Sequence, residues 1–333
     1  MTSASSARTT LPAAAFLLGA MALAVSFGTE PVSLVRAFTL PDSLDRLIVF
    51  DVRLPRVLLA AVAGGGLAVV GVAFQAVLGN PLAEPYVLGV SGGAALGATL
   101  AIVAGFTGAT LLGASLVPAA ALLGGLAATA LVYGVARATG PMTRTSMLLA
   151  GVVVNAIAGA AITLVKTLVA ASQAQELLFW LMGFLDVPSR TQLGFVTFYV
   201  AVGAAILLRD AGRLNLLALG DEGAMHLGVD VHALERRTFL ACSLVVGAIV
   251  SVTGLIGFIG LVVPHALRRL YGPDARTLLP ASLLAGGGVL VLCDLGSRAV
   301  FRVLHTEPPV GAVTALIGGP LFLVLLGRRG GVG

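Results

Sequence analysis

Apolar residues dominate this chain in long stretches that contain no charged side chain. These stretches cover residues 9–29, 57–83, 85–136, 145–165, 191–208, 238–267, 277–293 and 308–327. A helix needs roughly 20 consecutive apolar residues to cross the hydrocarbon core of a bilayer. Most of the stretches approach or exceed that length, and 85–136 is long enough for two crossings with a turn between them. The pattern predicts an all-α polytopic membrane protein.

The apolar stretches predict nine helices, and the charges at the two ends of the chain argue for a tenth. The nine lie near 11–29, 57–79, 90–108, 114–136, 146–168, 191–209, 238–256, 278–297 and 309–327. Arg8 precedes the first helix and Arg328 follows the last, so the positive-inside rule places both termini in the cytoplasm. Matching ends require an even number of crossings. A short additional helix is therefore predicted within 255–271, where Pro264 interrupts the apolar pattern.

The whole chain, residues 1–333, is thus predicted to form a single transmembrane domain of about ten helices. The longest polar stretches, 30–56, 169–190 and 210–237, are expected to be connections. Arg8 ahead of an apolar stretch is also typical of a cleaved signal peptide. Because many further spans follow, we favour an uncleaved first helix.

Charged residues make up only 11% of the chain, against about 25% in ordinary soluble domains. This composition excludes a soluble globule, and the high hydrophobicity excludes a disordered chain. The formal net charge is +5, but the basic residues lie at predicted helix ends and form no stripe with aromatic residues, so nucleic acid is not an expected partner. Most arginines fall on the predicted cytoplasmic side. Arg53, Arg56 and Arg298 are among those that fall outside, against the rule.

Motifs for catalysis are missing from the sequence. A phosphate-binding P-loop ends in Gly-Lys-Ser/Thr, but the only lysine is Lys166, which follows a valine. The histidines do not form the His-Glu-x-x-His pattern of a metalloprotease, and Ser91 has no preceding strand that would make it a nucleophile. Cys242 and Cys293 lie inside apolar runs and are expected to be buried hydrophobic residues. We therefore expect neither an enzyme nor a metal site.

A distinctive segment follows the second predicted helix. The sequence Arg53-Leu-Pro-Arg56 opens that helix, and Pro81 is expected to end it. A kinked segment containing Pro85 then leads to the next helix, which Ser91 could cap. Irregular backbone at membrane depth must be satisfied by protein or by a water-filled cavity. The sequence concerned is Gly79-Asn-Pro-Leu-Ala-Glu-Pro-Tyr-Val-Leu-Gly-Val-Ser-Gly-Gly-Ala94.

Together with three further motifs, this segment resembles the FecCD-type permeases of ABC importers that take up iron-siderophore, haem and cobalamin. The three are Gly257-Phe-Ile-Gly-Leu-Val-Val-Pro-His265, Asp294-x-x-x-Arg298, and Pro309-Val-Gly-Ala-Val-Thr-Ala-Leu-Ile-Gly-Gly-Pro-Leu-Phe322. The resemblance implies a type II importer permease in the bacterial inner membrane: a homodimer of ten-helix subunits with two cytoplasmic ATPase subunits and a periplasmic binding protein. ATP and Mg would bind the ATPase, and this chain would need no cofactor. The expected cargo is an iron chelate, either a siderophore complex or haem, with cobalamin as the alternative.

The connection 210–237 carries Leu219-Gly-Asp-Glu-Gly-Ala-Met-His-Leu-Gly228, which is similar to the ATPase coupling loop of ABC importers. The family pattern has alanine where this chain has Gly223. A coupling loop requires a short rigid helix with small residues, and a glycine suits its C-terminal cap. The resemblance assigns coupling to Asp221, Glu222, Gly223, Ala224 and Gly228. The alternative is a solvated amphipathic connection.

The arginines that break the positive-inside rule acquire a role from the same resemblance. Arg53, Arg56 and Arg298 match positions at which family members present cations to acidic residues of the binding protein. Such charge complementarity raises association rates and fixes the docking register. Two alternatives are pairing with lipid headgroups and, for Arg298, pairing with Asp294 four residues earlier on the same helix face.

Polar residues on the fifth predicted helix are candidates for the translocation path. Asn155, Gly159, Thr163 and Lys166 are spaced so that they share one helical face. Polar side chains within a membrane usually face a bundle interior or a cavity. The alternatives are an interhelical hydrogen bond for Asn155 and snorkelling to the interface for Lys166.

One other class of function remains open from the residues alone. An ion-coupled secondary transporter would need intramembrane carboxylates as ion sites, and only Asp294 and Glu84 are available. A metal or haem ligand is conceivable for His265, although a hydrogen-bonded structural histidine is favoured. No residue in the sequence selects among the chelates that the family carries.

Overall fold

The computed structural model describes residues 3–84, 86, 89–106, 110–111, 114–138 and 144–327, and these are almost entirely helical. The pair β1 (Thr110–Leu111) and β2 (Ala114–Ser115) forms a short antiparallel ladder. Turns of π-helix (Ile48–Arg53) and 3-10 helix (Leu217–Leu219) adjoin the longer helices. The α-helices are α1 (Ser3–Ser26), α2 (Leu34–Thr39), α3 (Leu44–Leu47), α4 (Leu54–Val77), α5 (Val90–Val103), α6 (Leu116–Ala138), α7 (Arg144–Leu168), α8 (Ala171–Met182), α9 (Arg190–Leu216), α10 (Asp221–His226), α11 (Val231–Thr253), α12 (Ile259–Tyr271), α13 (Ala275–Leu304) and α14 (Val310–Gly327).

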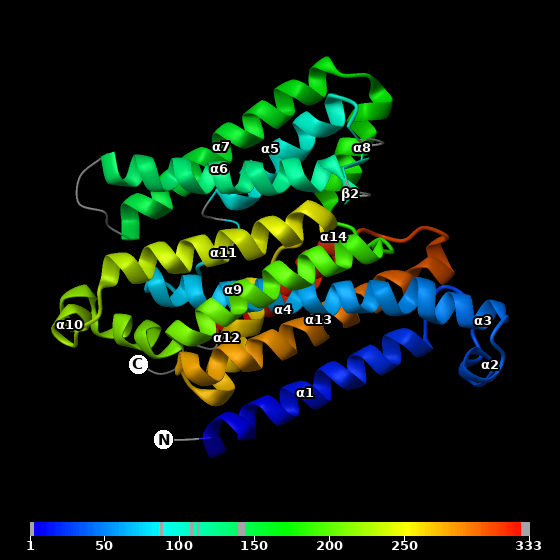
Figure 1. Ribbon diagram of the computed structural model, residues 1–333, viewed down its shortest axis with the longest axis horizontal. Coiled ribbons are helices and arrows are strands. Elements are labelled where there is room, and N and C mark those ends of the chain that lie inside the picture. Colours follow the sequence, from blue (N-terminus) through cyan, green and yellow to red (C-terminus); the bar gives the residue numbers. More distant parts are fainter. Residues whose placement is uncertain are drawn as a thin grey trace.

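The helices confirm an all-α membrane protein. Within the described residues, seven helices are long and apolar enough to cross a membrane, and two shorter apolar helices, Val90–Val103 and Val310–Val324, accompany them. These nine correspond to the nine predicted stretches, and α12 lies where the tenth segment was expected. The start of α1, the end of α14 and α10 lie toward one end of the molecule, whereas α2 and α3 lie at the other (Figure 1). Which end faces the cytoplasm, and the number of true crossings, stay predictions; Arg328 and Arg329 lie outside the described residues.

Three local features differ from the sequence-based expectations. The stretch 169–190, expected to be a connection, contains the helix α8, and the stretch 30–56 contains α2 and α3. The predicted Ser91 cap is wrong: Gly89, with φ of 84°, precedes α5, and the Ser91 hydroxyl donates to the Tyr86 carbonyl at 3.2 Å instead. Glycine adopts a positive φ readily, so Gly89 takes the position before α5 and Ser91 becomes the second residue of the helix. Pro85 of that kink lies outside the described residues.

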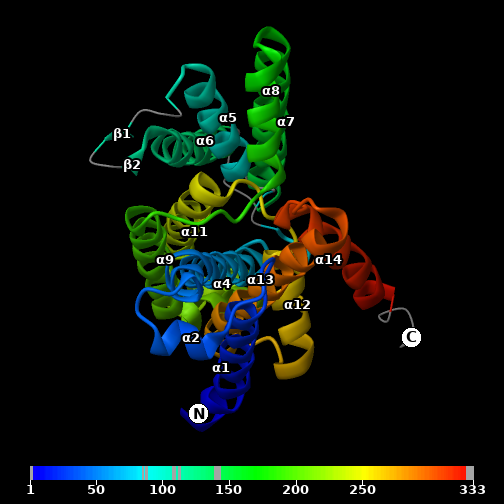
Figure 2. The same ribbon diagram turned by 90° about the vertical axis from the view of Figure 1, so that its right-hand side faces the viewer.

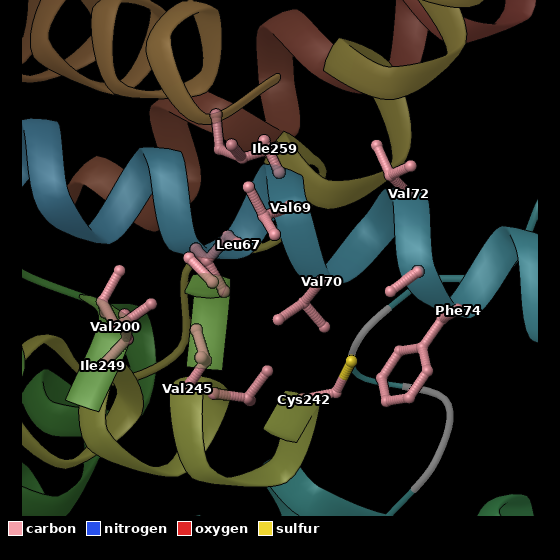
Figure 3. Close-up of a cluster of buried hydrophobic side chains, with 14 of the residues drawn as sticks. Leu67, Val69, Val70, Val72, Phe74, Val200, Cys242, Val245, Ile249 and Ile259 are labelled. Carbon is pink, nitrogen blue, oxygen red and sulfur yellow. The ribbon is translucent and has the colours of Figure 1, made fainter. Parts of the chain in front are cut away.

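The helix α4 occupies the centre of the fold. Within its apolar window 83% of residues are buried, against 22% for α7. Side chains leave α4 in several directions and meet α9 at Val200, α11 at Val245 and α12 at Ile259 (Figure 3). Cys242 packs in the same cluster, and both cysteines are buried free thiols, as expected from their apolar surroundings. A second group, α5 to α8, lies to one side of this body (Figure 2).

Glycines allow the helices that surround α4 to approach its backbone. A Cβ atom added at Gly64 would clash with the Gly286 carbonyl on α13, and one at Gly71 would clash with the Gly260 carbonyl on α12. Lipid tails are as apolar as leucine, so helix association in a membrane depends on such close packing of small residues. The two triple-glycine segments of the chain, 64–66 and 286–288, pack against each other.

This packing predicts opposite effects for two glycine substitutions. Gly71→Ala forces α4 away from the Gly260 backbone, and overpacking of this kind costs about 1–3 kcal/mol. Gly134→Ala in α6 meets no atom within 4 Å and removes a poor helix former, so it should leave stability unchanged or raise it by up to about 1 kcal/mol. Thermal unfolding of the two detergent-solubilised variants measures the difference. Equal midpoints for both variants would contradict the close α4–α12 contact.

Candidate functional site

An arginine cluster, Arg53, Arg56, Arg298 and Arg302, occupies the end of the molecule opposite α10, where α1, α4 and α13 meet. The Arg53 guanidinium donates to the carbonyls of Val25 at 2.9 Å and Ser26 at 3.1 Å, and also to that of Glu30. Arg298 donates to the Ala24 carbonyl at 3.1 Å, and Arg302 donates to that of Gly28 at 2.8 Å. The last carbonyls of a helix have no partner within the helix. Three arginines from outside α1 therefore cap its C-terminus.

Arg56 differs from its neighbours because it bridges two carboxylates. Its Nη2 lies 2.9 Å from Asp294 Oδ1 and 2.9 Å from Glu307 Oε2, and its Nε donates to Asp294 Oδ1 at 2.9 Å. Asp294 also pairs with Arg298, whose Nε lies 3.0 Å from Oδ2. The four groups form a charge-balanced network that joins α4, α13 and the α13–α14 connection. Pairing of this kind makes a buried carboxylate tolerable in a membrane protein.

These contacts show which groups of the chain Arg53, Arg56 and Arg298 bind, but they do not test the predicted docking role. The Asp294–Arg298 pair, one of the two alternatives, is present. Arg53 and Arg298 are only 4% and 3% exposed, and their guanidinium groups are occupied by α1 carbonyls. Arg56 differs because one of its partners, Glu307, has a side chain that is 30% exposed. The docking assignment stays a prediction for all three.

The predicted coupling residues form a compact helical turn at the opposite end. Gly220, with φ of 86°, precedes α10, and Gly228, with φ of 81°, follows it. The Val229 N–H donates to the Ala224 carbonyl at 3.1 Å, which is the bond expected after a glycine at the helix end. Ala224 is fully buried, whereas Leu219, Met225 and Leu227 are exposed. The short helix and its terminal glycine are confirmed; the coupling role of Asp221, Glu222, Gly223, Ala224 and Gly228 stays a prediction.

The four candidate path residues on α7 do not have a common environment. Asn155 accepts from the Gly92 N–H at 3.1 Å and donates to the Tyr86 carbonyl at 2.6 Å, so it makes the interhelical hydrogen bonds that the alternative proposed. Thr163 is exposed and donates to the Gly159 carbonyl of its own helix at 2.8 Å. Gly159 is also exposed and Lys166 half-buried. Their role in a path stays a prediction.

Two irregular segments are held together where Tyr86 meets the α11–α12 connection. The Tyr86 hydroxyl donates to the Ile256 carbonyl at 2.7 Å and accepts from the Ile256 N–H at 2.8 Å. The Glu84 carboxylate accepts from the Phe258 N–H at 2.8 Å, at a residue with φ of 68°. Since Glu84 bonds here and Asp294 pairs with arginines, the two carboxylates that an ion-coupled transporter would use are separately engaged.

Glycines form a second contact that the sequence did not indicate. The start of α14 meets the end of α8 and the α11–α12 connection, where the Gly311 N–H donates to the Gly183 carbonyl at 3.1 Å. A Cβ at Gly254 would clash with the Trp180 carbonyl, and one at Gly311 would clash with the Met182 carbonyl. The sequence holds many glycines, and only their neighbours in space distinguish these. The sequence analysis also missed the pairing of Glu307 with Arg56, because only the fold brings these two residues together.

His265 is buried in α12 with its ring edge-to-face against Phe322. Among the residues that the structure describes, no group of three or more His, Cys, Asp or Glu side chains is arranged to hold a metal ion. The structure therefore gives no support to a ligand role for His265.

Comparisons with known proteins agree with these features. The FecCD transport family matches residues 13–328. The chain is 41% identical to a cobalamin import system permease protein of Halobacterium salinarum, over 88% of this chain and 76% of the relative. It is 40% identical to a hemin transport system permease protein of Yersinia pestis, over 84% of this chain and 83% of the relative. A solved inward-facing structure of a metal-chelate type ABC transporter superposes with a TM-score of 0.86 at 30% identity, covering 96% of this chain and 99% of the other.

The cap on α1 predicts that Arg53 matters for stability. Arg53→Gln leaves several carbonyls at the end of α1 without a charged donor, which should cost about 1–3 kcal/mol and lower the thermal unfolding midpoint. Arg36→Gln is the matched control, because the Arg36 side chain lies at the same end and is 63% exposed, so its pair with Asp45 contributes about 1 kcal/mol or less. A midpoint for the Arg53 variant equal to that of the control would show that the cap contributes no stability.

Proposed function

The chain belongs to the FecCD transport family and is a multi-pass permease of an ABC importer, and we propose that it carries an iron chelate, either a siderophore complex or haem, into the cell. The observation that carries this proposal is the likeness over almost the full chain to a metal-chelate type ABC transporter. Cobalamin is the alternative, favoured by the relative from Halobacterium salinarum. Both cargoes are metal ions enclosed by organic ligands, so a transport path for either need not supply metal ligands of its own.

The proposed assembly is a homodimer in the inner membrane with two ATPase subunits on one side and a binding protein on the other. Two exposed surfaces support it. The α10 end presents Leu219, Met225 and Leu227 beside acidic Glu222, a combination that suits a groove on another subunit. The helix α7 presents a long apolar face that includes Val153, Ile157 and Leu164 and is available to a second copy or to lipid.

In the proposed mechanism, ATP and Mg act on the partner ATPase, and this chain converts movement of the coupling loop into alternating access. The end of α9 adjoins that loop and is joined to α13, because the Asn215 side chain donates to Asp274 at 2.6 Å and accepts from the Ala275 N–H at 2.7 Å. A displacement of the loop therefore acts on the start of α13. Helices with few buried residues, such as α7, can change position at lower cost than α4.

Reconstituted transport tests the cargo and the energy source together. Proteoliposomes that contain the chain and its partner ATPase, with the binding protein outside, should accumulate a ferric siderophore or haem only when ATP is enclosed. A non-hydrolysable ATP analogue and cobalamin are the controls. Preference for cobalamin would replace the cargo assignment, and uptake that ran on an ion gradient without ATP would overturn the importer mechanism.

The coupling surface predicts a selective loss of ATPase binding. Met225→Asp places a charge on the exposed side of α10, so the permease should fold normally but recover at least tenfold less ATPase on co-purification. Leu44→Asp, also at an exposed position but at the opposite end, is the control and should recover the normal amount. Normal ATPase recovery by the Met225 variant would remove α10 from the interface.

A further inference from the structure

A groove with a cavity volume of about 440 Å³ lies between α6, α9 and α11, which come together on one side of the molecule (Figure 2). We call it the α9–α11 groove. Most of its wall is aliphatic, and Leu240, which belongs to this wall, is 56% exposed. The aliphatic lining residues are Leu126, Ile206, Leu240, Ala241 and Leu244. Two arginines, Arg209 and Arg237, also line the groove.

The charged and aliphatic residues divide the groove along its length. On α11, Arg237 is followed by the three aliphatic lining residues at spacings of three, four and seven, so all four share one helical face. On α9, Ile206 precedes Arg209 by three residues. Because α10 follows α9 and precedes α11, both arginines lie on the α10 side of the groove. The aliphatic residues extend from them toward the middle of the two helices.

The arginine end of the groove has more positive than negative charge. Asp210 is the one carboxylate among the described lining residues, and it is 3% exposed. Asp210 already pairs with Arg213 at 2.6 Å and lies 3.5 Å from Arg237 Nε. The Arg237 side chain nevertheless stays 46% exposed. Arg209 is exposed and has no ion pair with any residue that the structure describes, so the groove offers it to an outside anion.

We propose that the α9–α11 groove binds an anionic phospholipid, with the phosphate at Arg209 and Arg237 and one acyl chain along the aliphatic wall. Phosphate oxygens accept strong charge-assisted hydrogen bonds from guanidinium groups. Basic pockets between membrane helices bind anionic headgroups at the membrane surface. A soluble anion would gain nothing from the aliphatic wall, whereas an acyl chain gains apolar contact along its length.

The position of the groove gives the lipid a structural effect. It would contact both α9 and α11, the two helices between which α10 lies, and so hold the base of α10 together. A ligand that binds only the folded state stabilises it by mass action. The site requires only that the chain lies in a membrane, so it stands independently of the cargo and of the importer function.

Native mass spectrometry of the full chain in detergent tests the headgroup contact. Phosphatidylglycerol should be retained about fivefold or more over phosphatidylethanolamine with the same acyl chains. Arg209→Gln should lower phosphatidylglycerol retention about fivefold, the contribution expected of one basic residue near a membrane surface. Arg209→Lys, which keeps the charge, should retain most of the binding. Arg236→Gln is the matched control, because Arg236 is an exposed arginine beside Arg237 that does not line the groove, and its loss should be clearly smaller.

A second variant tests the acyl-chain contact. Leu244→Trp fills the groove without changing its charge, so it should lower phosphatidylglycerol retention several-fold. Inorganic phosphate should not displace the lipid from the wild-type chain. Because Arg209 has no ion pair with a described residue, Arg209→Gln should keep the wild-type thermal midpoint in lipid-free detergent. Phosphatidylglycerol should then raise the midpoint of the wild type more than that of this variant.

Four results would overturn the lipid site. Equal retention of the two lipids by the wild type, or equal losses for Arg209→Gln and Arg236→Gln, would remove the specific headgroup contact. Normal retention by Leu244→Trp would remove the acyl chain from the groove, and displacement by inorganic phosphate would assign the arginines to a phosphate ion. A change in the oligomeric state of Leu244→Trp would instead assign the groove to a second copy of the chain.

Discussion

Contact between the backbones of α4 and α13 determines where the charged groups of this permease lie. Gly64 and Gly286 approach so closely that neither position has room for a Cβ atom. The two helices run antiparallel, with Arg56 eight residues before Gly64 and Asp294 eight residues after Gly286. A glycine contact in the middle of two antiparallel helices therefore brings an arginine and an aspartate together about 12 Å away. The ion pair at the end of the bundle follows from the register set in its interior.

Much of the fold could be predicted from the sequence because membrane helices carry a strong signal. Apolar length locates the long spans, and the overlong apolar run 238–267 correctly indicated a further helix, α12. The break between the helices lies at 254–258, however, and Pro264 lies inside α12. The resemblance to a coupling loop predicted the short helix α10, with Gly228 suited to its C-terminal cap. The helix α8 escaped prediction because its residues are mixed and it is too short to cross a bilayer. Its position depends on contacts with residues distant in the sequence, such as Leu255, which no local pattern reports.

In the candidate sites, too, the sequence indicated some features, whereas others depend on contacts between distant residues. Asn155 was correctly singled out as a polar residue inside a membrane helix, but its partners, Gly92 and Tyr86, decide that it braces the start of α5. The positive-inside rule marked Arg53, Arg56 and Arg298 as exceptions, and the family resemblance singled them out for docking. Their positions in the sequence could not show that the end of α1 would lie against them and occupy two of their guanidinium groups. A single sequence reveals which groups need partners, and the fold decides which partners they obtain.

The helix α13 joins the two ends of the molecule at which partners are proposed to bind. Its 30 residues span about 45 Å. The helix begins beside Asn215 of α9, near the coupling loop, and carries Asp294 and Arg298 in the arginine cluster. Because its middle is packed against α4 through glycines, sliding of α13 along α4 would force carbonyls and side chains into each other. The two helices should therefore move as one unit. Alternating access would then have to come from movement of less buried elements, such as α7 and α14, relative to this unit.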